Sequence, residues 1–222
     1  MELEEAIRTR RTHKAYGSQP VDRALLDELL DLARWAQTLT EEFLAACLRI
    51  DSEGEDLGEP GEVSWYPDRT WHGRTFVPGT AHSSTGYELY GYVSYAPGGD
   101  GEEPGDFHAV ADYTAETADA NPDWQIDLCD EVIGTWRGEQ GKAAAMTLVW
   151  GRPLVEGGAV VTAELADLNV DQCVLVEGRF TLIAPDDYRG DTLDIKLFDR
   201  RGGQLALESL YAEDAEDGEE DD

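Results

Sequence analysis

Residues 172–184 read QCVLVEGRFTLIA, a stretch in which apolar and β-branched residues recur with a period of two. This pattern is typical of short β-strands bounded by turn residues. Together with six similar stretches, it predicts a mostly β domain over residues 65–211, an antiparallel sandwich or flattened barrel of about eight strands. The six are YELYGYVSYA (87–96), FHAVADYTA (107–115), AAAMTLVWG (143–151), GAVVTAEL (158–165), TLDIKLFD (192–199) and QLALESLY (204–211).

The two halves of this β region resemble each other. GYVSYAP at residues 91–97 aligns with GRFTLIAP at residues 178–185, and a Gly-Asp pair and a strand ending in Asp follow each of them. The matches favour a duplicated unit of about four strands, although short strands also resemble one another by chance. Residues 198–203, FDRRGG, predict the turn of a closing hairpin in which glycine supplies a positive φ.

Three further segments differ from the β region in composition and in the spacing of their apolar residues. Residues 1–50 carry apolar residues at three- and four-residue spacing, which predicts helices with Asp22 and Thr40 as N-caps. Residues 51–64, DSEGEDLGEPGEVS, are acidic and rich in glycine, as linkers are. Residues 212–222, AEDAEDGEEDD, have too little apolar surface to bury, so a disordered acidic tail is expected.

The chain is strongly acidic. Asp and Glu number 48 against 17 Lys and Arg, which gives a formal net charge of -31. Such a surface repels phosphate backbones and anionic lipid head groups, so nucleic acids and membranes are not expected as partners. The acidic, lysine-poor composition fits adaptation to high salt, and a GC-rich genome combined with an acidic tail explains it equally well.

Several features indicate a cytoplasmic protein. No run of about 18 apolar residues is present, so no membrane-spanning helix is expected. The N-terminal sequence MELEEAIRTRR begins acidic and lacks an apolar segment, which argues against a secretory signal. Cys47, Cys129 and Cys173 do not have zinc-ligand spacing, and buried free thiols suit a reducing compartment.

A basic cluster precedes the helical pattern near the N-terminus. Arg10, Arg11, Thr12 and Lys14 concentrate positive charge and a hydroxyl group beside a predicted helix boundary. Arginine side chains and backbone N–H groups in this position suit a phosphate or a carboxylate. The alternative is that these cations pair with nearby carboxylates of the chain.

Residues 6–36 read AIRTRRTHKAYGSQPVDRALLDELLDLARWA and contain an Arg-Arg-Thr-x-Lys-x-aromatic stretch, a Pro-Val pair and a helix ending in Ala-Arg-Trp-Ala. In these features the chain resembles the N-terminal segment of the FMN-dependent nitroreductase family, over residues 3 to about 36. The resemblance implies that Arg10, Thr12 and Lys14 contact the flavin phosphate, with Arg11 nearby. It also implies FMN as the cofactor and a flavin site at a dimer interface.

Trp65, Tyr66 and Trp71 form an aromatic patch in the stretch SWYPDRTWHG. Exposed aromatic side chains on a β-sandwich stack on sugar rings or peptide side chains, so these three residues are a candidate ligand site. The alternative is that they pack in the core at the edge of a sheet.

Asp186, Asp187 and Asp191 bring carboxylate oxygens together in the loop PDDYRGDTLD. Oxygen ligands of this kind suit calcium, so the three residues are a candidate metal site. A solvated acidic turn is the alternative, because the spacing is not that of an EF-hand.

No reaction centre can be assembled from the remaining residues. The four histidines are dispersed, and His82 lies beside two serines without a third catalytic partner. The sequence therefore favours a non-catalytic β-sandwich module that binds an unknown protein or small molecule, with no cofactor expected. An FMN-dependent oxidoreductase is the alternative, and a carbohydrate- or calcium-binding module is a further one.

Overall fold

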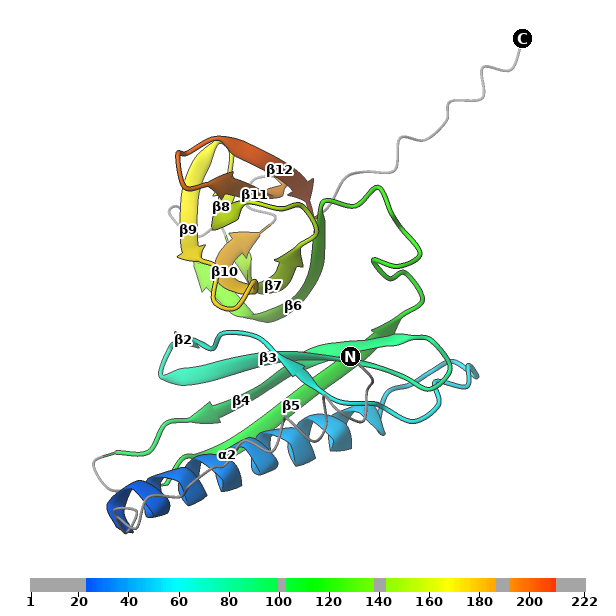
Figure 1. The fold of residues 1–222 in the computed structure, drawn as a ribbon, viewed down its shortest axis with the longest axis vertical. Helices are drawn as coiled ribbons and strands as arrows, with labels where there is room; N and C mark the ends of the chain where they lie inside the picture. Colours follow the sequence, from blue (N-terminus) through cyan, green and yellow to red (C-terminus); the bar gives the residue numbers. More distant parts are fainter. Residues whose placement is uncertain (1–22, 100–102, 138–142, 187–191, 211–222) are drawn as a thin grey trace, which may run out of the picture. The chain divides into compact units, whose positions relative to one another are not determined.

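A computed structural model describes residues 23–99, 103–137, 143–186 and 192–210 of the chain (Figure 1). The chain divides into two compact units, residues 1–38 and 39–222. All the described strands lie in the second unit and pair antiparallel. The predicted mostly β, antiparallel fold with an N-terminal helical segment is therefore confirmed.

The helical part of the described chain is one continuous helix, α2 (Arg23–Cys47), and not separate helices meeting at Thr40. The residues around Thr40 include no glycine or proline that would end a helix. Thr38 instead satisfies its hydroxyl within the helix by donating to the carbonyl of Arg34 at 3.0 Å. No helix in the described part of the chain is long and apolar enough to span a membrane.

The first sheet packs its first strand against the end of α2. Phe43 of α2 is fully buried, and its ring meets the Trp65 ring edge-on with the centroids 5.6 Å apart. A Cβ atom at Gly79 would lie 3.0 Å from the Trp65 ring, so glycine provides the space that the indole occupies. The strands are β1 (Ser64–Trp65), β2 (Arg69–Trp71), β3 (Arg74–His82), β4 (Glu88–Ala96) and β5 (Gly105–Thr114), in the order β1-β3-β4-β5 with β2 also paired to β3.

Two smaller sheets contain the remaining strands. The second sheet has the order β10-β7-β6, with β6 (Ile126–Arg137), β7 (Ala143–Pro153) and β10 (Phe180–Asp186). The third sheet has the order β12-β11-β8-β9, with β8 (Gly158–Leu165), β9 (Leu168–Val174), β11 (Leu193–Asp199) and β12 (Gln204–Ser209).

Strand β7 is buried on both faces and separates two apolar clusters. Val149 belongs to the larger cluster, whereas its neighbours Leu148 and Trp150 point to the opposite face and belong to the smaller one. The smaller cluster also contains Tyr66, Phe76 and Tyr92. The other buried members of the larger cluster are Ile126, Val161, Ala163, Leu165, Phe180, Leu182, Ala184, Leu193, Ile195, Leu197 and Ala206.

The internal similarity of the two halves does not extend to strand pairing. β4 and β5 are neighbours in one sheet, whereas their sequence counterparts β10 and β11 belong to different sheets. The described chain has twelve strands in three sheets, compared with the predicted count of about eight. The increase comes partly from short strands such as β1 and β2, which are too brief to show a period of two.

Residues 51–64, which the sequence favours as a linker, make hydrogen bonds to the first sheet. The N–H of Gly61 donates to the carbonyl of His82 at 2.9 Å, and the N–H of Ser84 donates to the carbonyl of Glu59 at 2.9 Å. The phenol of Tyr87 donates to Glu55 at 3.0 Å. Glycine and proline suit tight turns as well as flexible spacers, so composition alone did not separate the two cases.

Candidate functional site

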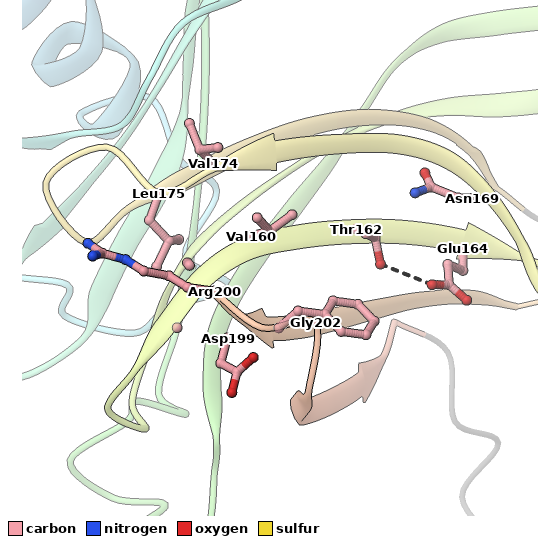
Figure 2. A pocket seen from close by; sticks show the side chains of 12 residues that line it. Val160, Thr162, Glu164, Asn169, Val174, Leu175, Asp199, Arg200 and Gly202 are labelled. Carbon is pink, nitrogen blue, oxygen red and sulfur yellow. Dashed lines mark hydrogen bonds between the residues drawn. The ribbon is translucent and has the colours of Figure 1, made fainter.

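The outer face of the third sheet carries a hollow of about 840 Å³, which we call the groove (Figure 2). It is lined by the apolar side chains of Val160, Val174, Leu175 and Phe198, by polar residues of β8 and β9, and by the turn between β11 and β12. Val160 is paired with Val174 on one side and with Phe198 on the other, so these three side chains share one face of the sheet. The neighbouring Val161 points the opposite way, into the core.

One end of the groove is polar and internally paired. Thr162 donates to Glu164 at 3.1 Å, and the ammonium group of Lys196 donates to the other oxygen of the same carboxylate at 2.6 Å. The bond from Lys196 lowers the pKa of Glu164 below its usual value and raises the pKa of Lys196. Glu164 is therefore ionised at neutral pH, and the positive charge of Lys196 compensates its negative charge.

The other end of the groove is the turn predicted over residues 198–203. Oδ1 of Asp199 accepts hydrogen bonds from the N–H groups of Arg201 at 2.7 Å and Gly203 at 2.8 Å. Gly202 has a φ of 83°, which glycine adopts without strain. The predicted hairpin turn is confirmed, since β11 pairs with β12 across it, and it presents Arg200 to the groove.

A second hollow of about 450 Å³ lies where β2 meets β9 and β10. Arg69 and Asp171 form an ion pair across it, and Asp171 also accepts from the N–H of Ile183 at 2.9 Å. Trp71 contributes to its lining. Because Arg69 and Asp171 are already paired with each other, a ligand that bound either of them would have to displace the other.

A buried cluster of titratable groups lies between the first and second sheets. The thiol of Cys129 donates to Oε1 of Glu88 at 3.8 Å, and Nδ1 of His82 lies 3.9 Å from Oε2 of the same carboxylate. Asp127 accepts from Arg152 at 2.9 Å. Burial and then the charge of Asp127 raise the pKa of Glu88, and burial raises the pKa of Cys129 well above its usual value. A raised pKa favours the protonated thiol, which is a poorer nucleophile than the thiolate.

Of the three predicted aromatic ligand residues, Tyr66 is buried and Trp65 is partly buried. Trp65 packs against Phe43, and Tyr66 is 8% exposed with the guanidinium of Arg179 placed 5.4 Å from its ring centre. Burial raises the pKa of Tyr66 to about 12. Trp71 lines the second hollow, and its ring centroid lies 4.2 Å from that of His72.

Most of the other predicted site residues lie outside the described part of the chain. Asp186 is buried at the end of β10. No group of three or more His, Cys, Asp or Glu residues that could hold a metal ion occurs among the described residues. The predicted site residues outside the described ranges are Arg10, Arg11, Thr12 and Lys14 of the flavin-phosphate site and Asp187 and Asp191 of the calcium site.

The groove residues were not predicted from the sequence. Alternation in GAVVTAEL indicates that Val160 and Val161 face opposite sides. It does not say which valine faces solvent, nor that β8 lies between β9 and β11. That arrangement brings Val174 and Phe198 to either side of Val160, although they lie far apart in the sequence.

Comparisons of the chain with protein-family models, with curated proteins and with solved structures found no match. The functional argument therefore rests on the geometry and chemistry of the described residues.

Proposed function

We propose that the chain is a non-catalytic binding module whose ligand site is the groove on the third sheet. The observation that supports this most is the row of Val160, Val174 and Phe198 on the outer face of a sheet whose inner face is already buried in the core. Val174 is 65% exposed. Apolar side chains that line a concave exposed surface mark a binding site more often than a chance exposure does.

The groups that line the groove are suited to holding a ligand rather than to reacting with it. Glu164 is tied to Lys196 and its pKa is lowered, which makes it a weak general base. The described lining contains no cysteine, serine or histidine. Thr162 provides a hydroxyl, and that hydroxyl donates to Glu164.

The test uses the neutral apolar dye N-phenyl-1-naphthylamine with the full-length chain. We expect saturable enhancement of its fluorescence. Val174→Asp should weaken binding by about tenfold, because the dye would then cover a charge that needs water. Leu207→Asp is the matched control: Leu207 is paired with Lys196 on the same face, is 43% exposed and lies outside the groove lining.

Two results would contradict the proposal. One is the absence of saturable dye binding to the unmodified chain. The other is an equal loss of binding in Val174→Asp and Leu207→Asp, which would mean that the dye senses the whole surface and not the groove.

A second candidate is an FMN-dependent oxidoreductase, which the resemblance of residues 3 to about 36 favours. Charge-assisted contacts from Arg10 and Lys14 would contribute roughly 1.5 to 3 kcal/mol each, and immobilisation of the ligand offsets much of that. We therefore expect the purified chain to be colourless and to bind added FMN weakly. Stoichiometric copurified flavin, lost in Arg10→Ala with Lys14→Ala, would make the oxidoreductase the leading function.

The carbohydrate- and calcium-binding alternatives have less support from the geometry. Tyr66 is buried next to the guanidinium of Arg179, and Trp65 is partly buried against Phe43, so these two residues offer little open ring surface to a sugar.

A further inference from the structure

We propose that the ligand of the groove is a medium-chain alkyl carboxylate, whose chain lies on the apolar row and whose carboxylate pairs with Arg200. This inference rests on the groove being a ligand site, as proposed above, and adds the chemical class of the ligand.

The apolar part of the groove suits an unbranched alkyl chain. Val160, Val174, Leu175 and Phe198 contribute only hydrocarbon surface. Val160, Val174 and Phe198 form a row across neighbouring strands, so the contact surface is elongated rather than round. Burying apolar surface is worth about 25 cal/mol per Å², and each methylene that the row covers adds to the binding free energy.

Arg200 is the one cationic side chain among the described residues that line the groove. Glu164 is neutralised by Lys196 at 2.6 Å. Asp199 is occupied by the N–H groups of the turn, at 2.7 and 2.8 Å. Arg200 has no carboxylate partner among the described residues, and its side chain lines the same hollow as the apolar row (Figure 2).

The position of Arg200 is unusual for this chain. The formal net charge is -31, yet the turn that closes the groove contains two adjacent arginines and one aspartate. Some of the described arginines are paired with acids, as Arg69 is with Asp171 and Arg152 with Asp127, and Arg200 is not among them. A free guanidinium at the end of an apolar row favours a ligand that is apolar along its length and anionic at one end.

The size of the groove favours a small molecule over a folded partner. Its volume of about 840 Å³ is within the range of about 300 to 1,000 Å³ that small-molecule sites occupy. A stable protein interface would need roughly 800 Å² from each partner, whereas the groove is bounded by the polar end at Glu164 and by the turn at Asp199.

The experiment measures displacement of bound N-phenyl-1-naphthylamine by sodium decanoate and by 1-decanol, which share the same chain length. High salt is included to screen the long-range repulsion between decanoate and the acidic chain. Arg200→Gln should raise the decanoate concentration needed for displacement about fivefold. The same variant should leave displacement by 1-decanol unchanged, because the alcohol makes no ion pair.

Arg201→Gln is the matched control, because it removes the same charge from the same turn at a position outside the groove lining. It should leave displacement by both probes unchanged. Equal effects of Arg200→Gln and Arg201→Gln would overturn the inference, as would an equal effect of Arg200→Gln on decanoate and 1-decanol.

The outcomes for the two proposals are separable. If the dye and 1-decanol bind to the groove and decanoate does not, the alkyl carboxylate is wrong while the binding module stands. If neither the dye nor decanoate binds, with decanoate also titrated directly by calorimetry, both proposals are wrong.

Discussion

Phe180→Ala should lower the free energy of unfolding by about 4 kcal/mol, because it removes a large aromatic side chain from a site that cannot collapse to fill the space. Phe180 is fully buried, at the start of β10. It belongs to the core cluster to which the second and third sheets both contribute, with Val161 and Ile195 on the facing strands. The loss therefore combines the lost transfer free energy of the ring with the cost of a cavity.

Urea unfolding at fixed salt, followed by tryptophan fluorescence, measures this effect. Leu168→Ala is the control, since Leu168 is 68% exposed and its truncation should cost about 0.5 kcal/mol or less. A Phe180→Ala protein as stable as the Leu168→Ala protein would show that the core between these two sheets is not packed as described.

Gly151→Ala should lower the free energy of unfolding by about 3 kcal/mol, through overpacking rather than through a cavity. A Cβ atom at Gly151 would lie 2.1 Å from the backbone carbonyl oxygen of Asp127 on the neighbouring strand. Main-chain atoms in a paired strand cannot turn aside as a side chain can. The substitution must therefore separate β6 from β7, and the hydrogen bonds between them weaken.

The same unfolding measurement tests this prediction, with Gly105→Ala as the matched control. Gly105 is also a strand glycine, and a Cβ atom there would have no heavy atom within 4 Å, so its substitution should change stability by about 0.5 kcal/mol or less. The ring of Phe180 lies 3.1 Å from the added Cβ of Gly151. Because the closest clash is with the main chain of Asp127, combining Phe180→Ala with Gly151→Ala should not restore stability.

Phe180→Ala should also affect the groove, because Phe180 packs in the core cluster against the inner face of the sheet that carries the groove. Ala163 and Ile195 pair across β8 and β11 and point into the core, while Val160 and Phe198 pair across the same strands and face the groove. Residues on rigid, well-packed strands hold a binding surface in place better than residues on loops do. Phe180→Ala loosens the packing behind the third sheet, so the Phe180→Ala protein should bind the dye more weakly than the unmodified chain.

The sequence by itself determined the fold class and one turn. A period of two over stretches such as GAVVTAEL and TLDIKLFD specifies strands with two unlike faces, and these became β8 and β11. Residues 198–203 predicted a hairpin turn that needs a positive φ, and Gly202 adopts it. These features depend on residues close together in the chain, so local patterns are sufficient to predict them.

Only the tertiary structure decided which strands are neighbours, and the groove depends on that choice. β10 resembles β4 in sequence, yet it pairs with β7 and not with the strand that follows it. The sequence allows Trp65 and Tyr66 to be an exposed patch or core residues, and their contacts with Phe43 and Arg179 depend on the tertiary structure. Alternation of apolar and polar residues predicts that a strand has two unlike faces, but it does not identify the neighbouring strands. Strand pairing depends on hydrogen bonds and side-chain contacts between residues far apart in the chain.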